Sequence, residues 1–309
     1  MDDVDLGGRR LHLAIGMFDG VHLGHQSVIE AAVHSAKARC AMAGVLTFWP
    51  HPSALFHPED PTRQIMDPVS KARLFLELGA DLVIEQPFNQ SFSGVTAEAF
   101  LPYLRERLPG LDSIYVGENW RFGRGRFGDV SLLISLARRE GVNVVSMPRL
   151  QFNGEAISSS RIREALTGGR MEEANSLLGR FYCTRGVVTA GRGLGRTIGF
   201  PTLNLPWSGD LRPRYGVYGV RLRDPEQTGS EWVLGVANFG VRPTVEDSGD
   251  RPLLEVHVLQ ESCPFDVGAG LQVEWHFFVR PETRFSGVEE LRAQIARDCD
   301  HVRSRFFHS

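Results

Sequence analysis

Cysteine is scarce in this chain, and the few cysteines are far apart. The 309 residues contain four of them, Cys40, Cys183, Cys263 and Cys299, and no two form a Cys-x-x-Cys pair. Zinc sites and disulfide-stabilised small domains place their cysteines at short, repeated spacings. The spacing here argues against both and predicts free thiols in a reducing compartment.

Long apolar runs and an excess of positive charge are missing as well. No apolar run approaches the roughly 18 residues that span a bilayer, and the formal net charge is −3. Nucleic-acid-binding proteins carry clustered Lys and Arg instead. The N-terminus, Met-Asp-Asp-Val-Asp, lacks the basic region and apolar stretch of a signal peptide. We therefore predict a cytoplasmic protein that acts on small molecules, with no membrane or nucleic-acid partner. A homo-oligomer is compatible with the sequence.

A chain of this length is expected to form two domains, and its first half alternates strand-like and helix-like segments. An apolar run at 11–15 precedes a helical pattern that includes Val28, Ile29 and Val33, and a second apolar run follows at 45–48. The alternation predicts a doubly wound parallel sheet with helices on both faces, in a domain spanning 1–179. Further strands are expected at 82–85, 114–116 and 142–147, and further helices at 69–78, 97–107, 130–140 and 171–178.

From about residue 181 the pattern changes to short strand-like runs with no helices between them. Such a series, separated by Gly, Pro and Asp turns, predicts a small closed antiparallel barrel in a domain spanning 180–309. The segment 288–297 alternates apolar and charged residues and predicts one amphipathic helix against this barrel. The strands are expected at 185–189, 216–223, 232–237, 253–259 and 271–278.

A glycine-spaced run at 189–204 has the features of a phosphate site but contains no lysine, which excludes the usual P-loop. Glycines let backbone amides approach an anion, and two arginines add positive charge. Thr202 and Asn204 are two residues apart, so in an extended segment their side chains share one face. A hydroxyl and an amide oxygen suit Mg²⁺, which prefers hard oxygen ligands. An ordinary glycine-rich turn entering a strand is the alternative.

Two histidines, His22 and His25, lie where the first strand gives way to the first helix, with Gly24 between them. In an open parallel sheet this is where ligands bind, and a helix N-terminus attracts phosphate. Imidazoles there can donate hydrogen bonds to phosphate oxygens as charge develops. The pair could also be incidental, or bind a metal.

Two other segments carry polar groups with a functional and a plain interpretation. Ser160 is a good helix N-cap, and Arg163 lies one turn further on, over the same helix end, which suits ATP phosphates; capping alone would explain the serine. In 253–258 the alternation leaves Glu255 opposite the core-facing residues. There it faces either solvent or a site.

The run at 189–204 resembles the flavokinase module of prokaryotic riboflavin kinase/FAD synthetases, in which Pro-Thr-x-Asn binds Mg²⁺-ATP at the edge of a small Greek-key barrel. Leu203 replaces the family's usual Ala and is expected to face away from both ligands. The sequence Leu-Glu-Val-His at 254–257, following Asn-x-Gly-x-Arg-Pro-Thr at 238–244, also matches, and there the glutamate is the catalytic base. The resemblance implies that Glu255 is the base, that Thr202 and Asn204 bind Mg²⁺, that Asn238 and Arg242 bind flavin, and that ATP contacts Gly191, Gly193, Gly195, Arg196, Thr197 and Gly199.

The first half is similar to the same family's adenylyltransferase module, a Rossmann-like His-x-Gly-His nucleotidylyltransferase. Residues 16–25 resemble its first motif and 157–163 its partner motif. Residues 48–52 resemble its Phe-acidic-Pro-His-Pro segment, and 117–123 resemble its flavin- and nucleotide-side loop. The resemblance implies catalytic roles for His22, His25 and Arg163. It also implies that ATP contacts Gly16, Phe18, Asp19, Gly24, Ser158, Ser159, Ser160 and Arg161, and that flavin contacts Pro50, His51, Asn119, Arg121 and Phe122.

Two departures from the family pattern stand out. Trp49 replaces the usual carboxylate of the Phe-acidic-Pro-His-Pro segment; it could stack on a flavin or adenine ring, or it could simply pack. The turn at 260–268 lacks the family's Leu-Tyr-Gly, which often helps to close the flavin site. A carboxylate at position 49 could help to hold Mg²⁺ or a positively charged partner, which an indole cannot do, whereas the changed turn bears on riboflavin affinity.

The resemblance implies that riboflavin and ATP give FMN in the second domain, and that FMN and ATP give FAD in the first, both with Mg²⁺. A primary hydroxyl must lose its proton as it attacks phosphorus, whereas the FMN phosphate is already ionised. One site therefore needs a base and the other needs only positioning and positive charge. The alternatives are an enzyme with one of the two activities, or a flavin-binding protein without turnover.

Overall fold

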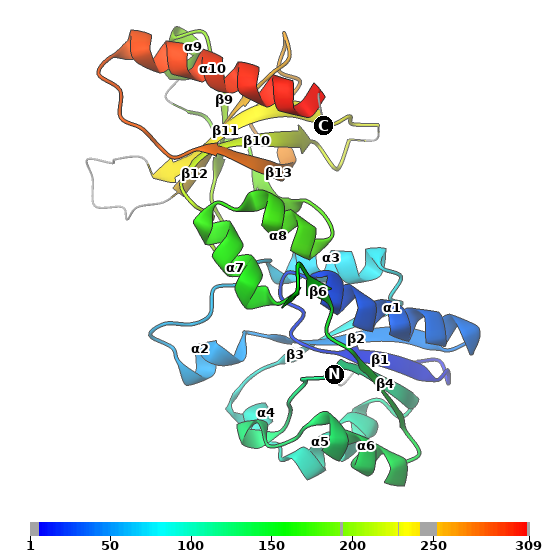
Figure 1. Ribbon diagram of the computed structural model, residues 1–309. Coiled ribbons are helices and arrows are strands. Elements are labelled where there is room, and N and C mark those ends of the chain that lie inside the picture. Colours follow the sequence, from blue (N-terminus) through cyan, green and yellow to red (C-terminus); the bar gives the residue numbers. More distant parts are fainter. Residues whose placement is uncertain (1–5, 192–193, 228, 242–251, 308–309) are drawn as a thin grey trace. The chain divides into compact units, whose positions relative to one another are not determined.

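The computed structural model describes residues 6–191, 194–227, 229–241 and 252–307. The chain divides into two compact units, Met1–Ser159 and Ser160–Ser309, and each is described by itself (Figure 1).

The first unit is built on a five-stranded sheet in the order β3-β2-β1-β4-β5. Every neighbouring pair in this sheet is parallel, as the alternation of strands and helices predicted. The strands are β1 (Leu11–Ile15), β2 (Met42–Trp49), β3 (Leu82–Pro87), β4 (Leu111–Gly117) and β5 (Asn143–Met147).

Helices cover both faces of this sheet, and each face has its own core. Because side chains alternate along a strand, Leu13 and Ile15 of β1 belong to one buried cluster and Ala14 to the other. The first cluster includes apolar residues of α5 (Ala97–Arg107) and α6 (Val130–Arg139). The second includes those of α1 (Leu23–Ala38) and α3 (Pro68–Glu77). The short helices α2 (Pro52–Phe56) and α4 (Gln90–Ser93) and a hairpin of β6 (Gln151–Phe152) and β7 (Glu155–Ala156) complete the unit.

The second unit contains a six-stranded antiparallel sheet in the order β8-β13-β10-β11-β12-β9. Strands β10, β11 and β12 are consecutive, and β13 returns to pair with β10, which is the Greek-key arrangement. An isolated bridge between Thr189 and Asn204 joins the two edges of the sheet. The strands are β8 (Tyr182–Val187), β9 (Thr202–Pro206), β10 (Gly216–Arg223), β11 (Val233–Val241), β12 (Pro252–Val258) and β13 (Gly270–Arg280).

Helices α7 (Ser159–Gly168) and α8 (Met171–Leu178) lead into this sheet, and the four-residue α9 (Leu194–Thr197) precedes β9. Asn175 of α8 is buried and donates to the carbonyls of Trp275 (2.8 Å) and His276 (3.2 Å), while its own carbonyl oxygen accepts from the Tyr182 amide. These bonds fix α8 on β13 and β8.

The C-terminal helix α10 (Val288–Phe307) is twice as long as the sequence predicted. Its second half begins with Asp298, which reads as a polar surface residue in the sequence but is buried. Arg280 explains the burial, because its guanidinium donates to both carboxylate oxygens of Asp298 at 2.7–3.1 Å. The helix therefore continues, with Cys299 and Val302 buried against the barrel.

Candidate active sites

The turn between β1 and α1 carries the two histidines of the first motif. His22 is the N-cap of α1, and its Nδ1 accepts the amide N–H of His25 at 3.2 Å. The two imidazoles stack with centroids 3.5 Å apart. A Cβ at Gly24 would lie 3.2 Å from the His22 ring, a tight contact that would push against the imidazole. The sequence therefore places both imidazoles side by side at a helix N-terminus, as predicted from their spacing.

The partner motif reaches this turn within the same unit. The Ser159 hydroxyl donates to the carbonyl of Asp19 at 2.9 Å. The Asp19 carboxylate is buried and accepts the Ile65 amide at 3.0 and 3.2 Å. Phe18 is also buried, packs edge-on against His25, and lies over Gly16. Of the predicted ATP contacts, Phe18 and Asp19 thus shape the turn through packing and backbone bonds.

A buried lysine that the sequence analysis missed supports the same turn. Lys71 of α3 is 3% exposed, and its Nζ donates to the carbonyl of Met17 (3.2 Å) and to Thr47 Oγ1 (3.0 Å). Burial lowers the pKa of this ammonium below its usual value, while the Asp19 and Glu85 carboxylates act in the opposite direction. The available signal was its spacing, since Lys71 lies one turn before the buried Phe75 on the same helix face.

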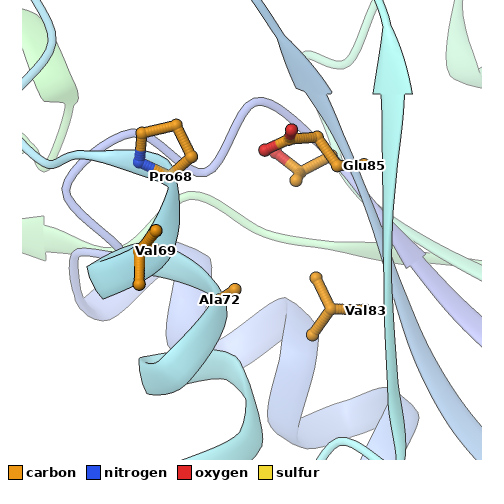
Figure 2. A pocket seen from close by; sticks show the side chains of 6 residues that line it. Pro68, Val69, Ala72, Val83 and Glu85 are labelled. Carbon is orange, nitrogen blue, oxygen red and sulfur yellow. The ribbon is translucent and has the colours of Figure 1, made fainter.

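An open pocket of about 280 Å³ lies between α3 and the edge strand β3. In Figure 2, Val69 and Ala72 come from the helix, and Val83 and Glu85 from the strand. None of its lining residues belongs to the predicted sites. It is lined by Thr47, Pro68, Val69, Ala72, Val83 and Glu85.

The predicted flavin-side residues of the first unit lie at the ends of β2 and β4. His51 caps α2, its Nδ1 accepting the Ser53 amide at 3.1 Å, directly after Pro50. With its amide in the orientation that its neighbours require, the Asn119 oxygen accepts from Arg149 at 3.0 and 3.1 Å. Arg121 Nη1 lies 3.7 Å from a carboxylate oxygen of Asp129.

The aromatic residues of these segments differ in exposure. Phe122 is buried and stacks on Trp120 with centroids 4.8 Å apart, so its ring belongs to the core. Trp49, at the end of β2, is 37% exposed. Among the residues that the structure describes, no aromatic ring stacks on the Trp49 indole. The exposure weakens the packing interpretation of Trp49.

The rest of the partner motif lies in the second unit, where α7 begins at Ser159, one residue before the predicted cap. Ser160 is therefore in the first turn, after Ser158 and Ser159, and Arg163 follows one turn later. Arg161 makes an ion pair with Glu173 of α8 at 2.9 Å. Hydrogen bonds from Arg170 and then Arg161 hold the pKa of the Glu173 carboxyl below its usual value, although burial acts in the opposite direction.

Three predicted residues of the second unit stand in one row across neighbouring strands. The register pairs Asn204 of β9 with Glu255 of β12, and Glu255 with Asn238 of β11. Directly paired residues point to the same face. Leu203 and Val256 are buried on the other face, as the alternation predicted. Three segments far apart in the sequence thus meet at Glu255.

The surroundings of Thr202 and Asn204 fit a hard cation. Both offer oxygen atoms, Asn204 is 6% exposed, and a Cβ at Gly191 would lie 2.2 Å from its amide nitrogen. A Cβ at Gly195 would lie 3.4 Å from Thr202 Oγ1. Gly191 therefore approaches the Asn204 side chain too closely for a larger residue, whereas a Cβ at Gly195 would only touch Thr202 and would collide with the backbone oxygen of Phe200 at 2.3 Å. Among the described residues no group of three His, Cys, Asp or Glu side chains could hold a metal instead.

The other residues predicted to contact ATP or flavin in this unit either lie close to Thr202 in the sequence or fall outside the described residues. Arg196 and Thr197 end α9, and Gly199 follows with a φ of 87°. Gly193 and Arg242 lie outside the described residues. The atypical turn at 260–268 is anchored, since Phe265 is buried and the Gly268 amide donates to the carbonyl of Val188 at 2.9 Å.

Comparison with known proteins identifies both units. The family model described as FAD synthetase matches residues 8–161, and the model described as riboflavin kinase matches residues 178–306. The chain belongs to the bifunctional riboflavin kinase/FMN adenylyltransferase family. Its membership agrees with the resemblance that the sequence motifs indicated.

Curated members of this family match over nearly their whole length. The bifunctional riboflavin kinase/FMN adenylyltransferase of Escherichia coli K12 is 37% identical over 93% of this chain and 90% of its own. The one from Listeria monocytogenes is 36% identical over 95% and 92%. A crystal structure described as a macrolide-efflux protein from Streptococcus pneumoniae superposes with a TM-score of 0.86 at 27% identity, covering 97% of this chain and 96% of the other.

No helix in the described part of the chain is both long and apolar enough to cross a membrane. All four cysteines are free thiols, as their spacing predicted.

Proposed function

We propose that this protein is a transferase that converts riboflavin to FMN and FMN to FAD, using ATP in both steps. The observation that carries the proposal is the presence of both family models, one on each half of a single chain. The row formed by Asn204, Glu255 and Asn238 supports the kinase step, and the stacked His22 and His25 support the adenylyl step. Riboflavin, FMN and FAD are accordingly substrate, intermediate and product.

In the kinase step, Glu255 is the base. It accepts the proton of the riboflavin 5′-hydroxyl as that oxygen attacks the γ-phosphorus of ATP, and ADP leaves. Thr202 and Asn204 hold Mg²⁺, which when bound neutralises phosphate charge. Asn238 and Arg242 orient the flavin. The ATP phosphates are bound by backbone amides and polar side chains of the glycine-spaced run, namely Gly191, Gly193, Gly195, Arg196, Thr197 and Gly199.

In the adenylyl step, the FMN phosphate is the nucleophile and needs no base. Its oxygen attacks the α-phosphorus of ATP, and pyrophosphate leaves. His22, His25 and Arg163 donate to the phosphates as charge moves to the leaving group. ATP contacts Gly16, Phe18, Asp19, Gly24, Ser158, Ser159, Ser160 and Arg161, and FMN contacts Pro50, His51, Asn119, Arg121 and Phe122.

We assign the adenylyltransferase to residues 1–179 and the kinase to 180–309, in a cytoplasmic enzyme whose partners are its small-molecule substrates. The free cysteines support a reducing compartment. Family membership and the absence of a clustered basic segment argue for small-molecule rather than nucleic-acid partners.

Incubation of the purified protein with riboflavin, ATP and Mg²⁺, followed by chromatographic separation of the flavins, tests the proposal. We expect FMN and then FAD to form, and neither product to form when Mg²⁺ is chelated. FMN without FAD would select an enzyme with kinase activity alone. Unchanged riboflavin, together with unchanged FMN in a parallel incubation to which FMN is supplied, would leave only a flavin-binding protein.

A further inference from the structure

A carboxylate that follows β13 reaches the row of polar residues on β9, β12 and β11. Glu282 lies two residues beyond the end of β13, and its Oε1 accepts the amide N–H of Asn238 at 3.3 Å. Asn238 is the direct cross-strand partner of Glu255. Glu282 therefore extends the row Asn204, Glu255, Asn238 by one further polar group.

Gly240 makes this approach sterically feasible. A Cβ on Gly240 would lie 1.9 Å from Oε1, 2.6 Å from Cδ and 2.9 Å from Oε2 of Glu282. Gly240 lies inside β11, with no left-handed φ that would itself call for glycine. Glycine weakens a strand interior and often marks a close approach of another group. Here the group that approaches is the carboxylate of Glu282.

The segment that carries Glu282 is itself fixed. Arg280, two residues earlier, holds the buried Asp298 of α10 and donates to the carbonyl of Pro281 at 3.0 Å. The carboxylate thus comes from an exposed segment that begins two residues after an arginine anchored to the C-terminal helix.

We propose that Glu282 is a positioning residue for riboflavin phosphorylation, acting through Asn238. By accepting from Nδ2, it fixes the orientation of the Asn238 amide and leaves Oδ1 to the flavin. The ribityl hydroxyls and the ring N–H of a flavin are hydrogen-bond donors, so a carbonyl oxygen is the matching partner. The inference rests on the proposed contact between Asn238 and flavin.

Steady-state kinase kinetics of Glu282→Ala, Glu282→Gln and Asn238→Ala test this role. Glu282→Ala should raise the KM for riboflavin about threefold to tenfold, the range for one lost hydrogen bond, with the KM for ATP unchanged. Glu282→Gln keeps an acceptor oxygen and should recover most of the loss. The unchanged KM for ATP reports correct folding of the second unit, and adenylylation of supplied FMN by the other unit is the internal control for enzyme concentration. Glu289→Ala, which removes an exposed carboxylate from α10, is the matched control.

Gly240→Ala is an independent test of the contact between Glu282 and Asn238. Its Cβ would displace the carboxylate, so it should raise the riboflavin KM in the parent and add little in the Glu282→Ala background. Additive effects of the two substitutions, or an unchanged riboflavin KM in Glu282→Ala, would overturn the inference. If Asn238→Ala also leaves that KM unchanged, the proposed flavin contact fails as well; if it raises the KM, only the role of Glu282 fails.

Discussion

Glu255 is the residue at which the two proposed reactions separate most clearly. It stands between Asn204 and Asn238 in the register of the second unit, and it has no role in the adenylyl step as proposed. Glu255→Gln keeps the shape of the side chain but removes the base. FMN formation should fall by about 10²–10⁴-fold, while FAD formation from supplied FMN stays near that of the parent. Loss of both activities would indicate misfolding or coupling, and loss of neither would remove Glu255 from this role.

Substitutions of Trp49 test whether its exposed indole contacts a substrate in the adenylyl step. At 37% exposed it can stack on a flavin or adenine ring, a contact worth about 0.5–1.5 kcal/mol beyond burial. Trp49→Ala should therefore raise the KM for FMN or ATP in the adenylyl step and leave FMN production unchanged. Trp49→Glu, which carries the family's usual carboxylate, should keep or improve FAD synthesis. A lower melting temperature with unchanged FMN affinity would instead mean that the indole only packs.

The candidate residues themselves were largely predictable, because each lies in a short motif with its own chemistry. Their contacts were not. Helical spacing places Lys71 on the same face as Phe75, but nothing local in the sequence says that its ammonium reaches Met17 or that Glu282 reaches Asn238, since both contacts join segments more than 40 residues apart. Long-range pairing of this kind follows from the packed fold and not from periodicity.

At the level of elements, Lys71 connects α3 and β2 to the turn that carries the histidines. Lys71→Met keeps the length of the side chain but removes both hydrogen bonds of the ammonium, so the Met17 carbonyl keeps only the bond from the Thr47 hydroxyl. Small displacements at a reacting centre are costly, and FAD formation should fall roughly 10-fold to 100-fold. FMN production from riboflavin is the internal control. An unaffected rate of FAD formation would show that the turn holds its shape without the lysine.

The pH dependence of stability gives a second measurement for the same pair of proteins. The native ammonium of Lys71 has a lowered pKa, so it releases its proton at a lower pH than in the unfolded chain. Between the two pKa values the unfolded state binds more protons, and the free energy of unfolding rises with pH. The parent should therefore gain stability relative to Lys71→Met as the pH approaches 10.5, the ordinary value for lysine. Denaturant titrations at several pH values measure the difference.

Most elements were predicted from their apolar periodicity, and the exceptions have a physical cause. Strand β10 and helices α5 and α8 have the expected bounds, because their patterns are strong and their ends carry turn or capping residues. The second half of α10 was missed because Asp298 is buried only by virtue of Arg280. In the sequence, Asp298 interrupts the apolar pattern and so indicates the end of the helix, because its ion-pair partner lies far away in the chain.

For the whole molecule, the division of the chain can be tested with fragments. We assigned the kinase to 180–309, whereas the compact unit begins at Ser160 and includes α8. Asn175 of α8 bonds to β13 and β8, and removing it leaves the Tyr182 amide buried without this acceptor. A fragment 160–309 should therefore melt roughly 5 °C or more above a fragment 180–309. Equal melting temperatures by calorimetry would mean that α8 contributes nothing to this unit.

The bridge between Thr189 and Asn204 has a consequence for the energetics of ATP binding. The backbone carbonyl of Asn204 accepts the Thr189 amide at 2.8 Å, and its side chain is a proposed Mg²⁺ ligand. The hydrogen bond that joins the two sheet edges and the proposed Mg²⁺ ligand therefore belong to the same residue. A local opening that separates the two edges would also disrupt the proposed Mg²⁺-ATP site. Bound Mg²⁺-ATP should therefore raise the free energy of this opening, and the increase should grow with the nucleotide concentration. Hydrogen exchange at the Thr189 amide should slow in proportion, while amides of the first unit that lie away from its own nucleotide site keep their rates.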